Sequence, residues 1–438
     1  MSITATVSEQ VAGRNLQLFN AARTVIPGGV NSFSRALDPP IVVRRAEGAY
    51  LYDADGRRYL DYHAAFGPIV LGHCHPAVNR AVADAIGRVD LVGIGVTELE
   101  TELAEMVHRH VPSADLVQFC NTGTEATYNA VRLARAVTGR TKLLKFQGCF
   151  HGSHDYLAMN VITPPERMGQ KDPGSAGMLA ESVAHTLIAE FNNLEQVRSI
   201  VAKEGRDLAA IILEPVQHNI GCVMPKQEFL AGLRQIATEN GIVLIFDEVI
   251  TGFRHDIGGF QRVCGIKPDL TTFGKAMANG FACAAVCGRA DLMSNFCTGG
   301  GKALFAGTYN GHPVAMAAGI ATIAALESGE VYRHMFDLGG KVRSGLDEIC
   351  RRIGVPAFIA GFGSIFTIYF MEGPVNSYTD LLRNNNRLDA AFRRELVARG
   401  ILVHPTPLKR NHICAAHSQA DIDFTLETAE AALRAVLQ

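Results

Sequence analysis

Helical and strand-like hydrophobic patterns alternate through the middle of the chain. The run Ile242–Phe246 is apolar at every position. Short strands that are apolar throughout are typical of a sheet covered by helices on both faces, so the pattern predicts an α/β fold with a mostly parallel central sheet. The expected helices are 76–88, 97–111, 123–138, 192–204, 226–240 and 312–327, and the expected strands are 115–120, 142–147, 208–214, 242–247, 269–273 and 282–287.

The two ends of the chain have a different texture. Residues 8–26 read as an amphipathic helix that ends before Pro27, and residues 49–61 predict a β-hairpin. After about residue 328 the pattern predicts a smaller α+β unit, with helices at 329–352, 386–399 and 419–437 and strands near 364–371 and 401–403. We therefore expect a large domain at residues 62–327 and a smaller, discontinuous domain made of residues 1–61 and 328–438.

Residues 153–190 form a long stretch without a clear hydrophobic period. The stretch contains several Gly, Pro and Met residues. An irregular segment of this length inside a compact domain is more often an active-site loop than a simple connection. We expect this segment to border the active site.

Composition narrows the classes of function. Of the 438 residues 48% are hydrophobic, and 41 Lys and Arg against 43 Asp and Glu give a net charge of −2. This balance lacks the basic footprint of a nucleic-acid-binding protein, and no apolar run approaches the roughly 18 residues of a membrane span. The first residues lack the basic start and apolar run of a secretory signal, so we expect a soluble, cytoplasmic protein.

The cysteines and histidines do not predict a metal site. None of the ten cysteines forms a C-x-x-C pair, and most lie in apolar strings, as core residues in a reducing compartment do. Residues 73–75 read His-Cys-His, but adjacent side chains point apart on an extended chain and no further ligand stands at a usable spacing. We expect neither disulfides nor a bound metal.

Two charged residues follow apolar strands and suggest a specific chemistry. Asp247 closes the strand 242–247, and Lys275 follows the strand 269–273, 28 residues later. The carboxyl ends of parallel strands form the edge where α/β folds place their ligands. A partly buried Lys can lose its proton and bind an aldehyde, while an Asp can keep a pyridine nitrogen protonated. Each residue alone reads more simply as a strand cap or a solvated Lys, but together they meet both needs of pyridoxal 5'-phosphate chemistry.

Further motifs follow other strands at the same edge. Gly123 lets the backbone approach a ligand at the start of helix 123–138, where free amides and the Thr124 hydroxyl suit a phosphate. Phe150 and Val249 are placed to contact a flat ring from opposite sides. Taken singly, each motif reads as a helix cap or a core residue, but their convergence on one edge indicates a cofactor site. The candidate residues are Thr122, Gly123, Thr124, Phe150, His151, Glu214, Asn219 and Val249.

In their order and spacing these motifs are similar to those of a known family. The chain resembles the class III pyridoxal-phosphate aminotransferases of fold type I, and most closely the branch that contains glutamate-1-semialdehyde aminomutase. The likeness covers roughly residues 20 to 435. The motifs that carry it are Asn121–Ala126, Phe150–Gly152, Glu214–Val216, Asp247–Val249, Gly274–Lys275 and Gly307–Thr308.

The resemblance implies a role for each of these positions. Lys275 would hold pyridoxal 5'-phosphate as a Schiff base, and Asp247 would pair with the pyridine nitrogen. Gly123 and Thr124 would bind the phosphate and Phe150 would stack on the ring, with His151 and Asn219 beside the site. The resemblance also implies a homodimer with shared active sites, in which Thr308, next to Gly307, reaches the phosphate of the neighbouring subunit.

The chain departs from the aminomutase pattern at three places. Ser32–Arg35 stands where the aminomutase has Ser-Pro-Val-Arg, Lys409 stands where it has a Glu, and Phe281–Ala285 replaces a run rich in Gly and Pro. These departures favour an aminotransferase that moves an amino group between an amino acid or amine donor and a keto acid or aldehyde acceptor, through a Lys275 aldimine and pyridoxamine phosphate. Arg35 with Ser34, and Lys409 with Arg410, are the candidates for binding a substrate carboxylate.

Two alternatives remain open. The first is an aminomutase of the glutamate-1-semialdehyde type, which shifts the amine within one substrate and needs a gated site, for which residues 153–190 could form a lid. The second is a pyridoxal-phosphate-binding regulator without turnover. The chain has no DNA-binding appendage, which argues against a regulator.

Overall fold

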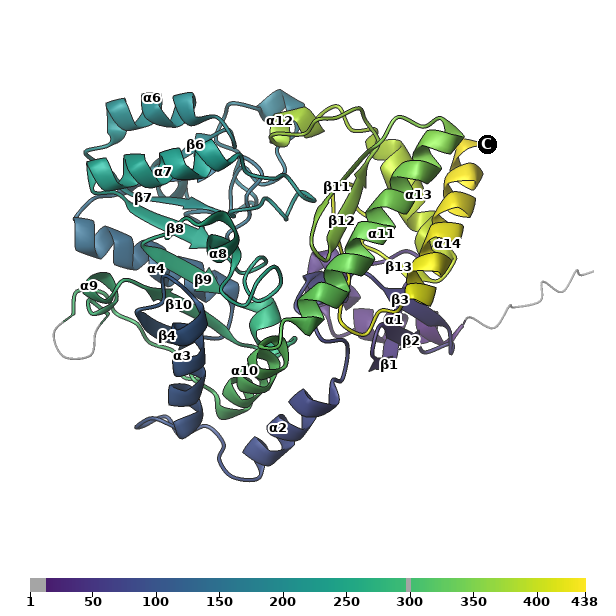
Figure 1. The fold of residues 1–438 in the computed structure, drawn as a ribbon, viewed down its shortest axis with the longest axis horizontal. Helices are drawn as coiled ribbons and strands as arrows, with labels where there is room; N and C mark the ends of the chain where they lie inside the picture. Colours follow the sequence, from purple (N-terminus) through teal and green to yellow (C-terminus); the bar gives the residue numbers. More distant parts are fainter. Residues whose placement is uncertain (1–12, 297–300) are drawn as a thin grey trace, which may run out of the picture.

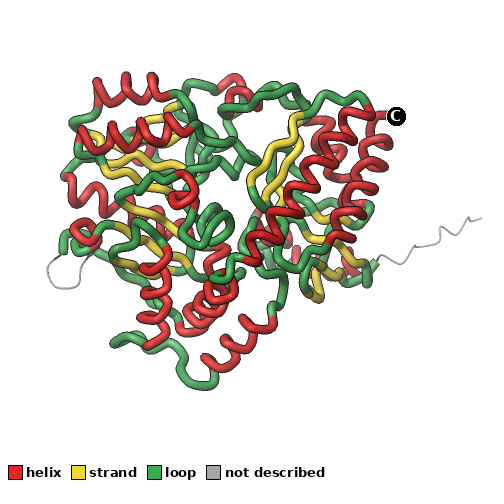
Figure 2. Tube along the Cα trace, in the orientation of Figure 1, coloured by secondary structure: helices red, strands yellow, loops and turns green. Residues whose placement is uncertain are grey.

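A central sheet flanked by helices dominates the computed structural model, which describes residues 13–296 and 301–438 (Figures 1 and 2). Its strands are β4 (Leu116–Cys120), β5 (Lys142–Phe146), β6 (Thr186–Ala189), β7 (Leu208–Leu213), β8 (Val243–Asp247), β9 (Leu270–Phe273) and β10 (Ala284–Gly288). Their order is β4-β10-β9-β8-β7-β5-β6, and β10 runs antiparallel to both neighbours while the other pairs are parallel. The predicted α/β architecture is confirmed.

Strand β8 shows why this sheet is buried on both faces. Leu244 and Phe246 pack in one apolar cluster with helices α6 (Leu194–Glu204) and α7 (Gln227–Asn240). Val243 and Ile245 point the other way and pack with α4 (Gly123–Thr138). Successive strand side chains alternate between faces, so a strand between two helical layers must be apolar at every position.

Three of the remaining helices of this part of the chain, α2, α3 and α10, pack together. Helix α10 packs against both α2 and α3, and the Thr97 side chain caps α3 by accepting a hydrogen bond from the Glu100 amide. The bounds are α2 (Pro76–Ile86), α3 (Glu98–His110), α5 (Ala180–Ala184), α8 (Phe260–Cys264), α9 (Ala290–Met293) and α10 (Pro313–Leu326).

The N-terminal and C-terminal segments form two smaller sheets and meet in one of them. The strands are β1 (Val43–Glu47), β2 (Tyr50–Asp53), β3 (Arg58–Asp61), β11 (Phe358–Phe362), β12 (Ile365–Tyr369), β13 (Ile401–Leu402) and β14 (Asn411–His412). The sheet order β1-β2-β3-β13 joins the predicted hairpin to the C-terminal segment, and β11-β12-β14 forms the other sheet. The helices are α1 (Arg14–Arg23), α11 (Glu330–Ile353), α12 (Tyr378–Leu381), α13 (Asn386–Ala398) and α14 (Gln419–Leu437). The domain boundaries at residues 62 and 327 stay a prediction.

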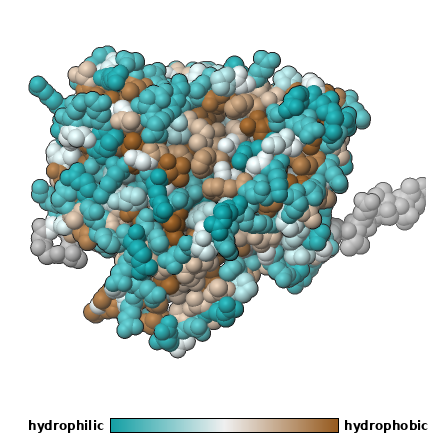
Figure 3. Space-filling view, in the orientation of Figure 1, coloured by the Kyte–Doolittle hydropathy of each residue, from teal (hydrophilic) through white to brown (hydrophobic). Residues whose placement is uncertain are grey.

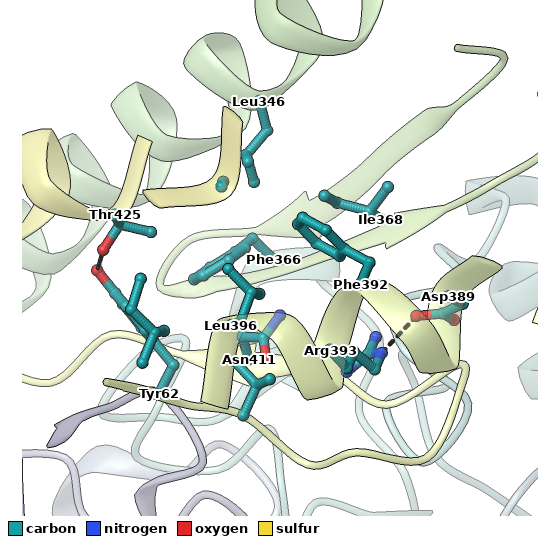
Figure 4. A pocket seen from close by; sticks show the side chains of 13 residues that line it. Tyr62, Leu346, Phe366, Ile368, Asp389, Phe392, Arg393, Leu396, Asn411 and Thr425 are labelled. Atoms are coloured by element: carbon teal, nitrogen blue, oxygen red, sulfur yellow. Dashed lines mark hydrogen bonds and ion pairs between the residues drawn. The ribbon is translucent and has the colours of Figure 1, made fainter. Parts of the chain in front are cut away.

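A compact core lies between α11, α13 and α14. It surrounds a small cavity of about 20 Å³, toward which Phe366, Phe392 and Leu396 point (Figure 4). At its rim Arg393 pairs with Asp389, and both side chains are buried. A buried Arg is tolerated when a carboxylate and carbonyl oxygens satisfy its donors, and Arg393 also donates to the carbonyls of His404 and Lys409.

Several short elements differ from the predicted pattern. The elements that were not expected from the sequence are strands β1, β6, β11 and β14 and helices α5, α8, α9 and α12. The segment 153–190 is therefore not irregular throughout, because it contains α5 and β6. Elements of two to five residues are too short to show a hydrophobic period, and their partners in the sheets define them instead.

The face of the molecule that is seen in Figure 3 mixes polar and apolar side chains. Hydrophobic residues show near the centre of this face, between the helices of the large sheet and α11–α14 (Figure 3). Within the described residues no single helix has the length and apolar composition of a membrane span, and one bent pair, α10 with α11, meets both criteria together.

Candidate active site

The carboxyl ends of β4, β5, β7, β8 and β9 meet at one cavity. Its volume is about 270 Å³. Because these strands are parallel, residues far apart in sequence reach the same edge. Nine of the predicted site residues line it: Thr122, Gly123, Thr124, Phe150, His151, Glu214, Asp247, Val249 and Lys275.

Asp247 lies at the base of this cavity as the last residue of β8, and it is buried. Its Oδ2 lies 2.7 Å from His151 Nδ1, while its Oδ1 accepts hydrogen bonds from the Val249 amide and the Thr272 hydroxyl, each at 3.1 Å. These donors hold the carboxylate in one orientation without an Arg or Lys partner. His151 was expected beside the site, and the structure places it in direct contact with Asp247.

Lys275 begins the turn that follows β9. Its backbone has a φ of 46°, a left-handed conformation that a side chain with a Cβ rarely adopts. Strain of this kind is concentrated at functional sites. Burial, followed by the positive charge of Arg410, lowers the pKa of Lys275 to about 8, against the opposing effect of Asp247 and Glu214. A much larger share of this amine is therefore uncharged near neutral pH than of a solvated Lys.

Two glycines make room at the start of α4. A Cβ on Gly123 would lie 2.9 Å from the Val249 side chain, and a Cβ on Gly152 would lie 2.7 Å from Thr124 Oγ1. The Thr122 side chain caps the helix by accepting from the Glu125 amide at 3.2 Å. The amides of the first helical turn face the cavity edge, and a helix start of this kind binds anionic groups.

Glu214 orders the loops on the other side of the cavity. Its carboxylate accepts hydrogen bonds from the Phe150 amide at 2.8 Å, the His218 amide at 3.0 Å and the Asn219 amide at 3.2 Å. Burial raises the pKa of Glu214. Phe150 itself is 42% exposed, an unusual position for a large aromatic residue beside a cavity.

The loop before β14 brings two cations, Lys409 and Arg410, next to the loop that carries His218 and Asn219. Lys409 Nζ donates to the Asn219 carbonyl at 2.9 Å, and Asn219 Nδ2 is buried without a hydrogen-bond partner among the described residues. Arg410 is buried and donates to the carbonyls of His218 and Phe66, at 2.8 and 3.0 Å, and to His412 Nε2. Arg410 is therefore not a solvated surface cation.

Seven predicted residues do not line the cavity within the described chain. Arg35, Gly307 and Thr308 are exposed, and the Ser34 carbonyl lies 3.2 Å from His404 Nε2. Lys409 contacts Asn219, which itself lies outside the cavity lining. The structure of one subunit therefore brings nine of the predicted residues together. It leaves outside the cavity lining Ser34, Arg35, Asn219, Gly307, Thr308, Lys409 and Arg410.

The sequence did not predict the segment Ala64–Gly67, which forms a wall beside the cavity. Ala64, Ala65 and Phe66 all have positive φ, followed by Gly67 and then Pro68, which lines the cavity. Nothing in two alanines and a phenylalanine signals a left-handed backbone, so only tertiary contacts explain it.

Two arginines hold this wall in place. Arg254 donates to the carbonyls of Gly67 and Ile69, and Arg410 donates to that of Phe66. Both guanidinium groups are buried. Each therefore acts through the backbone of the wall.

The cavity fits the expected cofactor in three respects. It offers a helix start with glycine clearance for a phosphate, an oriented carboxylate for a pyridine nitrogen and an amine of lowered pKa for an aldehyde. His151 Nε2 is buried and has no hydrogen-bond partner among the described residues, which leaves a polar atom for a ligand. These features are the chemical needs of pyridoxal 5'-phosphate.

Comparisons with known proteins agree with this geometry. The model of the aminotransferase class-III family matches residues 32–412. A glutamate-1-semialdehyde 2,1-aminomutase of Desulforudis audaxviator is 40% identical over 96% of this chain and 98% of its own length. An omega-transaminase from Sphaerobacter thermophilus has a TM-score of 0.93 and 32% identity, covering 99% of this chain and 100% of that one.

A further solved structure concerns the cofactor. A transaminase with PLP bound has a TM-score of 0.88 and 28% identity, and the match covers 99% of both chains. The family match and the bound cofactor of this neighbour confirm the expected cofactor. The chain belongs to the class III aminotransferase family and is a pyridoxal-phosphate-dependent enzyme of fold type I.

Proposed function

We propose that this enzyme transfers an amino group on a substrate that carries a carboxylate. The observation that carries the proposal is the convergence of Lys275 and Asp247 on one cavity beside the start of α4. Pyridoxal 5'-phosphate supplies an aldehyde that combines with amines and a ring that withdraws electrons from the substrate carbon. The protein's part is to bind, orient and move protons.

Asp247 is proposed to hold the proton on the pyridine nitrogen. His151 supports it, because a hydrogen bond to Oδ2 fixes the orientation of the carboxylate. Lys275 is proposed to attach the cofactor and then to move a proton at its Nζ, which its lowered pKa allows near neutral pH.

The remaining cavity residues are proposed to bind the cofactor without reacting. Gly123 and Thr124 would hold its phosphate at the start of α4, with Thr122 capping that helix. Phe150 and Val249 would enclose its ring, while Glu214 would order the loop that carries Phe150 and Asn219.

The homodimer with shared sites is also a proposal. Thr308 is exposed and lies outside the cavity of its own chain, as a residue that serves a neighbouring subunit would. We expect mixtures of Lys275→Ala and Thr308→Ala subunits to regain activity, because one site of each mixed dimer then has both residues. The measurement is turnover after co-refolding, with each variant first shown to be weak alone.

Two controls define this experiment. Unmixed variants must be at the same total concentration, and mixed dimers must be isolated with two affinity tags. Absence of recovered activity in isolated mixed dimers would mean that Thr308 acts in its own subunit or has no role.

The substrate carboxylate is proposed to meet cations at the side of Asn219. Arg35 is exposed and close enough to His63 to lower the pKa of that ring after the larger effect of burial. Ser34 lies beside Arg35, and Lys409 contacts Asn219. Arg410 is less suited than expected, because its donors already bind the carbonyls of His218 and Phe66.

Arg35→Ala should raise the KM for acidic substrates by about 10- to 150-fold, the effect of losing a charge-assisted hydrogen bond. An amine without a carboxylate should be affected little. The measurement is kcat/KM for a matched amino acid and amine in wild type, Arg35→Ala and Lys409→Ala. Equal losses for both substrates would mean that these residues shape the fold and that the carboxylate binds elsewhere.

Two reactions fit this substrate class. The name of the Desulforudis audaxviator relative favours the aminomutase form, and this finding supports the alternative better than the expected two-substrate aminotransferase. One observation favours the aminotransferase: Lys409, a cation, lies against Asn219 where the aminomutase pattern has a Glu. We place the aminomutase first and the aminotransferase second.

A single experiment separates the two. The enzyme, loaded with the amine form of its cofactor, is mixed with a panel of keto acids and aldehydes. An aminotransferase returns the cofactor spectrum to the aldehyde form and releases a new amine with each accepted substrate. An aminomutase converts glutamate-1-semialdehyde without any second substrate, and failure of both assays would contradict the proposed function.

A further inference from the structure

Lys145 is a lysine of β5 that is completely buried beside the cavity. Its Nζ donates to the carbonyl oxygens of Cys149 and Leu157, each at 3.0 Å, and to that of Met159. An ammonium group has three N–H donors, and here each has a carbonyl partner. Within the described residues no carboxylate forms an ion pair with it.

The three carbonyls belong to the two ends of one segment, Cys149–Met159. Lys145 therefore ties the beginning and the end of this segment to the same point on the sheet. Phe150 and His151 lie just after the first tie, where they contact Glu214 and Asp247. Farther along, the His151 carbonyl accepts a hydrogen bond from the Thr127 hydroxyl at 2.6 Å.

The burial of this ammonium group is explained by the three carbonyl oxygens that it binds. A buried cation is costly unless its hydrogen bonds are complete, and an apolar side chain would fill the same space. An apolar side chain would leave three buried carbonyls without donors, so the segment could not keep this conformation. Burial lowers the pKa of Lys145, and the negative charge of nearby Glu214 partly opposes this effect, but the hydrogen-bond partners of the ammonium group are all carbonyls of the loop.

We propose that Lys145 is a positioning residue for the cofactor: by binding three carbonyls it holds Cys149–Met159 in the conformation that presents Phe150 and His151 to the ring. The inference rests on the proposed roles of Phe150 and His151. Lys145 itself does not line the cavity. It acts through the backbone of the segment.

The test compares two positions on the same strand. Lys145→Met keeps most of the length of the unbranched side chain without its donors, and Lys145→Gln keeps two N–H donors without the charge. Lys142→Met is the matched control, because Lys142 lies at the other end of β5 and pairs with Glu204 and Asp207. The measurements are backbone hydrogen exchange across residues 149–159, the rate of cofactor dissociation and the visible circular dichroism of the bound cofactor.

We expect Lys145→Met to lose exchange protection within 149–159, to release the cofactor at least about tenfold faster and to change the dichroism per bound cofactor. Lys145→Gln should lie between Lys145→Met and wild type, and Lys142→Met should match wild type. A fall in melting temperature with unchanged dichroism and dissociation would overturn the proposal. Failure of both Lys145 variants to fold would assign the residue to global stability and overturn it as well.

Phe150→Ala separates this inference from the proposed function. If Phe150→Ala leaves dichroism and dissociation unchanged, the role proposed for Phe150 is wrong. If Phe150→Ala changes them and Lys145→Met does not, the role of Phe150 stands and only the inference about Lys145 is wrong.

Discussion

Lys275→Ala is expected to reduce turnover by about a thousandfold or more, because it removes both the attachment point of the cofactor and the group that moves the proton. Noncovalent contacts at the start of α4 should still retain part of the cofactor. The measurements are steady-state turnover and the amount of cofactor that copurifies. Borohydride reduction of the wild-type enzyme, followed by peptide mapping, should place the covalent label on Lys275.

The pH dependence gives this prediction a second check. Burial lowers the pKa of Lys275 to about 8 from an ordinary value of 10.5, so the reactive free amine accumulates as the pH rises through about 8. The rate at which the cofactor-free enzyme forms the covalent bond should rise over that range and level off above it. A label on another lysine, or a rate that keeps rising to pH 10, would contradict the assignment.

Asp247→Asn should lower turnover by roughly two to four orders of magnitude while cofactor binding partly survives. Asn keeps the shape but cannot stabilise a proton on the pyridine nitrogen. The Val249 and Thr272 donors can still be accepted by an amide oxygen, and His151 can change tautomer to face the amide group. The variant should therefore keep the hydrogen-bond geometry around residue 247 and lose most of its turnover.

Glu214→Gln is the matched control for this variant. Glu214 is a second buried carboxylate of the same cavity, but it accepts backbone amides of the loops. Its loss of turnover should be far smaller than that of Asp247→Asn. Near-normal turnover in Asp247→Asn would show that a different group pairs with the pyridine nitrogen.

The part of the site that lies on regular elements could be predicted from the sequence. Asp247 and Lys275 follow apolar strands, and a parallel sheet brings strand ends to one edge regardless of their separation along the chain. The order of those strands in the sheet did not have to be known, because the carboxyl ends of parallel strands lie at the same edge in any order. The central strands and long helices were also predictable, because each is long enough for its hydrophobic pattern to be recognised.

The rest depends on contacts that no local pattern contains. Arg410 looks like any loop cation in sequence, and only the folded chain shows that carbonyls of Phe66 and His218 enclose it. Lys145 reads as an ordinary strand residue for the same reason. The exposed positions of Arg35 and Thr308 are a different case, because the contact that we propose between Thr308 and a neighbouring subunit is not encoded in any local pattern of one chain.

The strained wall at Ala64–Gly67 has a consequence for how the newly made protein matures. Its backbone is held by Arg254 and by Arg410, which are 187 and 344 residues away from their partners in sequence. Phe66 is synthesised 344 residues before Arg410, so the last hydrogen bond that holds the wall cannot form until Arg410 has been made. Capture of the cofactor should therefore follow the synthesis of Arg410, and truncated nascent chains that end before Arg410 should not retain it.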